Sequence, residues 1–138
     1  MRRNLSYILF FFLFIYKIDA QIAVVANKSI NVNQLKKSQL IDIYSGEIRT
    51  WSSGDPIFVF DLKTEDETRE DFYKLIGRSS SRMKSIWMKK LLSGEGEPPK
   101  EFSSQESLIK KIATTKGAIG FVSIEKVTND VKVIKIIE

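Results

Sequence analysis

The order of apolar and polar positions along the chain predicts strands that alternate with helices. A continuous apolar run at 22–26 is typical of a strand that is covered on both faces. Apolar positions then recur at mostly helical spacing over 35–44, and Gly46 is placed to end that helix. A loop over 45–56 follows, and the apolar residues 57–60 predict a second buried strand.

Two helices are expected in the middle of the chain. Thr64 and Glu67 have the spacing of a capping box, and we expect the helix that they open to end at Gly77. The serines at 79–81 can begin the next helix, in which apolar residues recur every three or four positions. The glycine- and proline-rich segment 94–99 interrupts this pattern and predicts a break.

A further helix and two strands complete the predicted pattern. Ser103 and Glu106 form a second capping box, which opens a helix. Residues 117–122 predict a strand that contains glycines, and 131–136 alternate in part, which favours a last strand near a sheet edge. Strands separated by helices indicate an α/β fold, in which helices cover the faces of a sheet.

The first twenty residues have the pattern of a secretory signal. A basic head precedes an apolar run of twelve residues with one serine, and a more polar stretch ends at Ala20. Twelve residues form about 18 Å of helix, whereas the hydrocarbon core of a bilayer is roughly 30 Å thick, which disfavours an uncleaved anchor. We therefore expect a signal peptide over 1–20, cleaved after Ala20, one domain over 21–138, and no membrane anchor after cleavage.

Composition excludes most catalytic chemistry. The chain has 138 residues with neither cysteine nor histidine, so it has no disulfide, no thiolate nucleophile, no Ser–His–Asp triad and no cysteine- or histidine-bound zinc. The net charge of +5 falls to +3 without residues 1–20, which carry three basic groups and one acidic group. A weakly basic, exported chain gives no reason to expect a nucleic-acid partner. Export without cysteine fits a bacterial periplasm.

An acidic cluster admits two interpretations. Its carboxylates could bind a metal or act as paired catalytic groups. Four of them lie in the first turns of a predicted helix, where acids interact favourably with the helix dipole, so a solvated capping face is the favoured interpretation. We expect neither a metal nor a cofactor. The members of the cluster are Asp61, Glu65, Asp66, Glu67, Glu70 and Asp71.

Arg69 and the tryptophans are the other candidates for binding. Arg69 lies in a first helical turn, where a cation opposes the dipole, so it either meets a partner or pairs with a nearby acid. Trp87 lies on an apolar stripe and is expected in the core. Trp51 lies in a loop, where a lid on the core is favoured and stacking on a flat ligand is the alternative. The basic helix 81–90 is either a solvated face or a contact for an acidic surface.

Several motifs follow one another along the chain. They are the run 22–27, Leu35 to Gly46, Trp51, Gly54-Asp55, Pro56-Ile57, Thr68-Arg69-x-x-Phe72, Trp87, and Gly117-Ala118-Ile119-Gly120-Phe121-Val122. In this order they resemble a known family, the phosphate-type periplasmic substrate-binding proteins of ABC transporters. The resemblance covers about residues 22–125 and implies an α/β fold, one lobe of a class II periplasmic binding protein, with a central mixed sheet and helices on both faces. It also implies a protein that binds without catalysing.

The resemblance also implies a ligand-binding segment. A Ser-Gly-Thr at a helix N-terminus supplies neutral donors to phosphate in the family, and Asp66, Glu67 and Thr68 stand at the matching positions. Thr68 is retained, and Arg69 and Thr64 are further candidate ligand-binding residues beside it. The two acids would repel phosphate. Full-length members also hold the anion between two lobes and are more than twice as long, so we expect a degraded anion site.

Two hypotheses for the function follow. The first is an exported, non-catalytic protein similar to solute-binding proteins, with a small anion such as phosphate or an envelope protein as its partner. The alternative is an adaptor or structural interaction domain of the envelope, which uses the loop around Trp51 or the helix 81–90 as its contact. An enzyme ranks last, because no separated pair of carboxylates stands out.

Overall fold

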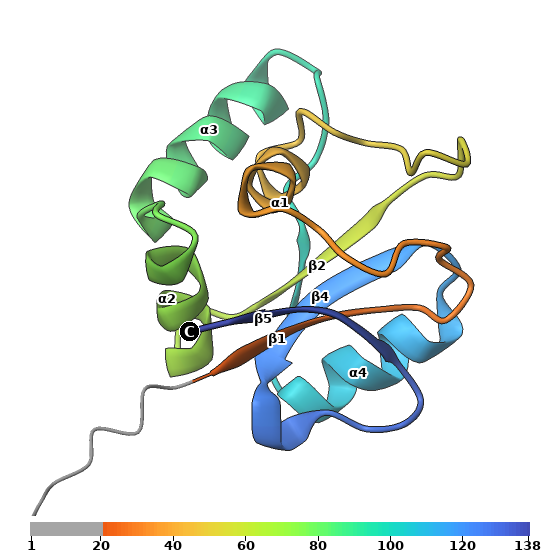
Figure 1. The fold of residues 1–138 in the computed structure, drawn as a ribbon. Coiled ribbons are helices and arrows are strands. Elements are labelled where there is room, and N and C mark those ends of the chain that lie inside the picture. Colours follow the sequence, from red (N-terminus) through yellow and green to blue (C-terminus); the bar gives the residue numbers. More distant parts are fainter. Residues whose placement is uncertain (1–20) are drawn as a thin grey trace, which may run out of the picture.

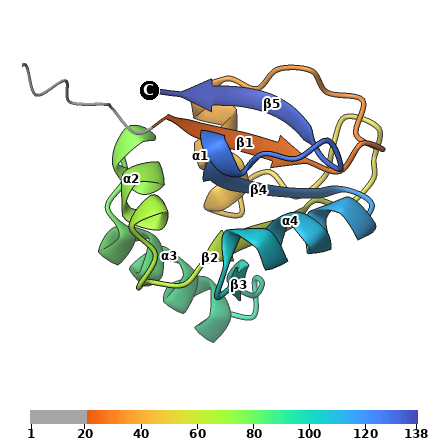
Figure 2. The ribbon, with the colours of Figure 1, turned by 90° about the horizontal axis from the view of Figure 1, so that it is seen from below.

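The computed structural model describes residues 21–138, which form one mixed β-sheet with helices on both faces (Figures 1 and 2). The strand order is β3-β2-β4-β1-β5. The signal peptide expected over 1–20 lies outside the described residues. The strands are β1 (Ile22–Ala26), β2 (Phe58–Leu62), β3 (Lys100–Phe102), β4 (Ala118–Ser123) and β5 (Lys132–Ile137).

Four strands run in one direction, and β1 opposes them. β2 pairs in parallel with β3 and β4, whereas β1 pairs antiparallel with β4 and β5. Every residue of β1 is buried, as the continuous apolar run predicts for a central strand. The carboxyl ends of β2, β3, β4 and β5 therefore lie at the same edge of the sheet, which we call the carboxyl edge.

Helix α4 covers one face of the sheet, and α1 and α2 cover the other (Figure 2). A Cβ atom at Gly120 in β4 would meet the side chains of Leu108 and Ile112 of α4 within 3 Å. The next residue, Phe121, points to the opposite face and stacks on Phe72 of α2, with ring centroids 3.9 Å apart. The fold class expected from the sequence is confirmed. The helices are α1 (Lys37–Tyr44), α2 (Glu67–Leu75), α3 (Ser80–Leu92), α4 (Gln105–Thr114) and the 3₁₀ helix η1 (Ile124–Lys126).

Two helix caps differ from the capping boxes expected from the sequence. Asp66, not Thr64, caps α2, because its Oδ1 accepts the amide hydrogen of Thr68 at 2.9 Å. Ser104, not Ser103, caps α4, and its Oγ accepts the Ser107 amide at 3.1 Å. Both predictions were wrong because an equally good N-cap follows the expected one, two positions after Thr64 and one position after Ser103.

The strand β3 was not expected from the sequence. Its three residues are exposed or half-buried, so they leave no apolar run, and they directly follow the proline pair of the segment 94–99. β3 pairs only with β2 and forms one edge of the sheet. The last strand, β5, forms the other edge, as its partial alternation predicts.

Candidate functional site

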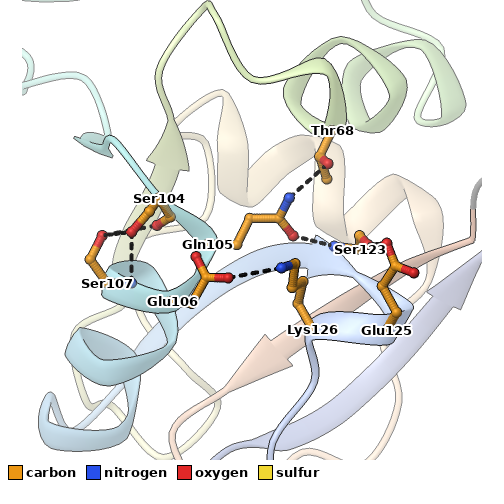
Figure 3. Close-up of polar contacts among 8 residues, drawn as sticks. All are labelled: Thr68, Ser104, Gln105, Glu106, Ser107, Ser123, Glu125 and Lys126. Carbon is orange, nitrogen blue, oxygen red and sulfur yellow. Dashed lines mark hydrogen bonds and ion pairs between the residues drawn. The ribbon is translucent and has the colours of Figure 1, made fainter.

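Three residues from different elements meet at the carboxyl edge (Figure 3). The Nε2 of Gln105 donates to the Thr68 hydroxyl at 3.0 Å, and the Oε1 of Gln105 accepts the Ser123 amide hydrogen at 2.8 Å. Gln105 opens α4, Thr68 lies in the first turn of α2, and Ser123 ends β4. One amide side chain therefore links two helix N-termini to the end of a strand.

Two amide donors at the carboxyl edge, those of Thr68 and Ser123, already have acceptors within the protein. Asp66 accepts the Thr68 amide, and Gln105 accepts the Ser123 amide. Ligands of open α/β sheets bind outside the carboxyl ends of the strands, and anions bind the amides of helix N-termini. An anion would have to displace the side chains of both Asp66 and Gln105 to reach these two donors.

The rim beside this network carries an exposed ion pair. Lys126 Nζ lies 2.9 Å from Glu106 Oε1, and both side chains are largely solvated. The hydrogen bond from Lys126 lowers the pKa of Glu106, and the same bond raises the pKa of Lys126. The cation nearest this rim is thus already paired with a carboxylate.

A second polar cluster lies on the other side of α2 and is buried. Asp61 is 3% exposed at the end of β2, and its Oδ2 accepts the Tyr73 hydroxyl hydrogen at 2.6 Å. Its Oδ1 accepts the Leu62 amide hydrogen at 2.7 Å and lies 3.4 Å from Arg69 Nε. The Arg69 guanidinium also lies over the Tyr73 ring, 5.0 Å from its centroid. Arg69 therefore joins α2 to β2 through a buried carboxylate.

The buried position changes the acidity of this cluster. Burial raises the pKa of Asp61, and the hydrogen bond from Tyr73 and the charge of Arg69 offset this only in part. Burial, followed by the charge of Asp61, also raises the pKa of Tyr73. The Nε of Arg69 is buried, and among residues 21–138 no acceptor forms a hydrogen bond with it.

A cavity of about 480 Å³ opens over this cluster, between α2, α3 and the segment 98–101. Its polar floor is formed by Asp61, Arg69 and Tyr73, with Thr64 at its border. The walls are mainly apolar side chains of α3 and the two prolines before β3. The other lining residues are Ser80, Ser81, Met83, Lys84, Trp87, Met88, Leu91, Pro98, Pro99 and Glu101.

The structure separates the candidate residues into three places. Thr64 and Arg69 both line the cavity, whereas Thr68 belongs to the Gln105 network. Trp51 lies at the opposite end of β4, where it is 7% exposed and its indole N–H donates to the Gly117 carbonyl at 3.0 Å. This placement agrees with a lid on the core. A role of the Trp51 loop as a contact stays a prediction.

Two expectations for the site residues were wrong. Asp61 is buried and does not belong to a solvated acidic face. Its place in the sequence between the apolar residues Phe60 and Leu62 already indicated burial. Trp87 is half-buried, not fully in the core, because its ring lines the cavity while its N–H donates to the Tyr44 carbonyl at 2.9 Å. Gln105, in contrast, carries no sequence signal for its role.

Two further observations apply to residues 21–138 alone. No three carboxylates in this range come together in a way that could hold a metal ion. No helix in the same range has both the length and the apolar character needed to cross a bilayer.

Three solved structures share this fold. A putative phosphate ABC transporter substrate-binding protein from Clostridium perfringens, solved with bound phosphate, superposes with a TM-score of 0.70 at 22% identity. An ABC-type phosphate transport receptor from Vibrio cholerae gives 0.67 at 25% identity. A possible phosphate-binding protein from Planctomyces limnophilus gives 0.62 at 17% identity.

The chain spans less than half of these structures. The matches cover 85%, 85% and 84% of this chain, but 46%, 47% and 42% of the three solved chains. Among curated proteins, none matches the sequence significantly. The model of the PBP superfamily domain matches residues 19–135, almost the whole described chain. The chain therefore belongs to the PBP superfamily, in a form that corresponds to about one half of the phosphate-type substrate-binding proteins it resembles.

Proposed function

We propose that this chain is an exported, non-catalytic relative of phosphate-type substrate-binding proteins in which the anion site is degraded. The observation that carries the proposal is the Gln105 network at the carboxyl edge. Thr68, at the position that the resemblance assigns to phosphate binding, donates its amide hydrogen to Asp66, and its hydroxyl oxygen accepts a hydrogen bond from Gln105. In this role the protein holds a small solute weakly or contacts another envelope protein.

The charges around Thr68 support the same proposal. Asp66 and Glu67 precede it directly, and both are acidic where the family supplies neutral donors. Phosphate carries between one and two negative charges at neutral pH, so two carboxylates next to it are unfavourable. Lys126, the cation at the rim, is paired with Glu106. The electrostatics of this edge thus oppose an anion that similar proteins bind.

Calorimetry with phosphate, sulfate and acidic metabolites tests the solute role. We expect weak binding of one of these solutes and no tight binding of phosphate. Tight phosphate binding would overturn the proposed degradation of the anion site. If no solute binds, the role in solute binding fails and the partner role is left.

The alternative role, an adaptor or interaction domain of the envelope, is favoured by one surface. Helix α3 exposes three large apolar side chains, Met88, Leu91 and Leu92, of which Leu92 is 82% exposed. The same helix also carries the basic residues Arg82, Lys84, Lys89 and Lys90. Pull-down from an envelope extract with the wild type and with Leu92→Glu tests this role. We expect the wild type to retain a partner protein that Leu92→Glu does not retain.

Export itself is tested by fractionation of cells and mass spectrometry. We expect the protein in the periplasmic fraction of a bacterial host, with Gln21 as its first residue. An intact N-terminus on the isolated protein would contradict cleavage after Ala20.

A further inference from the structure

Arg69 is a buried cation whose hydrogen-bonding capacity is largely unused. Its side chain is 10% exposed, and its buried Nε forms no hydrogen bond among the described residues, although it lies in an ion pair with Asp61. The nearest carboxylate oxygen, Asp61 Oδ1, is 3.4 Å away and already accepts the Leu62 amide hydrogen. A buried donor without a partner is costly, and a guanidinium presents a planar fork of five N–H groups that matches a carboxylate.

The cavity over Arg69 has the size and the polarity of a small-molecule site. Its volume of about 480 Å³ lies within the range of ligand pockets, which are mostly apolar with a few polar groups that fix orientation. Here the polar groups lie on the floor, where Arg69 is, and the walls are apolar. The wall residues that face the cavity from α3 are Met83, Trp87, Met88 and Leu91, and Pro98 and Pro99 face it from the opposite side.

The other charged groups at the cavity do not replace Arg69. Lys84 and Glu101 are exposed, carry opposite charges and lie on different elements. Asp61 is buried, and its two oxygens accept from Tyr73 and Leu62, so they are engaged within the protein. The guanidinium of Arg69 is thus the one buried group of the floor that still has donors to offer.

We propose that this cavity binds a small monocarboxylate with an apolar body. The carboxylate accepts hydrogen bonds from Arg69, and the body packs against Trp87, Met88 and the prolines. Inorganic phosphate is a poor occupant, because it leaves the apolar walls unfilled. None of Thr68, Gln105 and Ser123 lines the cavity, so the proposal does not depend on whether those residues bind an anion.

An NMR titration of the full-length protein with 3-phenylpropanoate tests the proposal directly. The chain has two indole N–H signals, of which that of Trp87 reports on the cavity and that of Trp51, at the other end of β4, serves as an internal control. We expect saturable shifts of the Trp87 indole and of the Arg69 signals, with Trp51 unchanged. The neutral amide, 3-phenylpropanamide, should bind at least about 10-fold more weakly, because it lacks the charge-assisted hydrogen bonds.

Variants at the cavity and outside it sharpen this test. Arg69→Lys keeps the charge but loses the planar fork, and we expect it to weaken the acid at least about 10-fold, while the exposed Arg78→Lys leaves it unchanged. Met88→Glu, at an exposed wall position, should weaken the acid more than the amide, because both lose an apolar contact but only the acid is repelled by the new carboxylate. Leu92→Glu, on the same helix but outside this cavity, should change neither.

Several outcomes overturn the proposal. They are equal affinities for the acid and the amide, shifts that spare Trp87 and Arg69, no saturable shift at all, or phosphate shifts at Arg69 as large as those from the acid. If Arg69→Lys does not fold, the comparison of Met88→Glu with Leu92→Glu still decides, because both positions are exposed.

Discussion

Gln105 is the residue on which the closed carboxyl edge depends. It connects Thr68, 37 residues away in the sequence, with Ser123, 18 residues away. All three residues are half-buried, so a partner lost from this network is only partly replaced by water. The same side chain thus contributes to the stability of the fold and withholds the Ser123 amide from a ligand.

Replacement of Gln105 by alanine should measure that contribution. We expect Gln105→Ala to lower the free energy of unfolding by about 1–3 kcal/mol, because the Ser123 amide and the Thr68 hydroxyl lose their partner. Urea denaturation provides the measurement. The exposed Gln34→Ala is the matched control and should cost under about 0.5 kcal/mol. Equal costs for the two variants would contradict the role given to Gln105.

The pKa of Asp61 should be shifted upward in the folded protein, whereas the pKa of a salt-bridged surface carboxyl is shifted downward. Burial raises its pKa in the folded protein above the ordinary value of 3.8, so the folded state binds this proton more tightly than the unfolded chain. The resulting stabilisation is complete below pH 3.8 and is lost as the pH rises through the folded pKa. As the pH rises from 3.8 through the folded pKa, the contribution of Asp61 to the free energy of unfolding therefore decreases.

A ¹³C NMR titration of the side-chain carboxyl carbons measures this directly. The midpoint for Asp61 should lie above 3.8, whereas that for Glu106 should lie below 4.5, because Lys126 donates to Glu106. Lys126→Met should move the Glu106 midpoint upward and leave Asp61 unchanged. An Asp61 midpoint below 3.8 would mean that Arg69 and Tyr73 outweigh burial.

At the scale of elements, the Trp51 loop is joined to β4 at Gly117. This glycine has a φ of +83°, and a Cβ there would lie 2.4 Å from the Pro56 carbonyl oxygen. The Gly117 carbonyl in turn accepts the Trp51 indole N–H. The close approach of two backbone segments therefore fixes how the loop covers the end of the sheet.

A pair of glycine substitutions separates backbone strain from this close approach. Gly117→Ala and Gly54→Ala both place a side chain at positive φ, which costs roughly 1–2 kcal/mol, but Gly54 has no atom within 4 Å of the added Cβ. We expect Gly117→Ala to lose at least about 2 kcal/mol more than Gly54→Ala in thermal or urea unfolding. Similar losses for the two variants would show that the backbone around Pro56 moves to accommodate the added Cβ at little cost in free energy.

The elements were predictable from the sequence where burial leaves a pattern. The run 22–26 predicts β1 because a central strand is apolar on both faces, and the periodic positions of α3 predict a helix. β3 was missed because three mostly exposed residues bury too little to leave such a pattern. The bond from Gln105 to Thr68 could not be predicted, because it depends on the order of β3, β2 and β4 in the sheet.

At the scale of the whole molecule, the described residues form one five-stranded sheet, and the chain spans about half the length of its structural relatives. Helices cover both faces, and buried residues come from every strand except β3. Binding proteins that enclose a ligand between two lobes obtain donors from both sides. In the described lobe, the amides of Thr68 and Ser123 are bonded within the protein, which is the basis for the expectation of weak phosphate binding.

An amide-resolved NMR titration of the full-length protein with inorganic phosphate tests the central claim most directly. If Asp66 and Gln105 retain the donors of the carboxyl edge, the amide signals of Thr68 and Ser123 should not move in a saturable way below about 1 mM phosphate, a Kd worth roughly 4 kcal/mol. Saturable shifts of these two amides at micromolar phosphate would contradict the claim and show a working anion site.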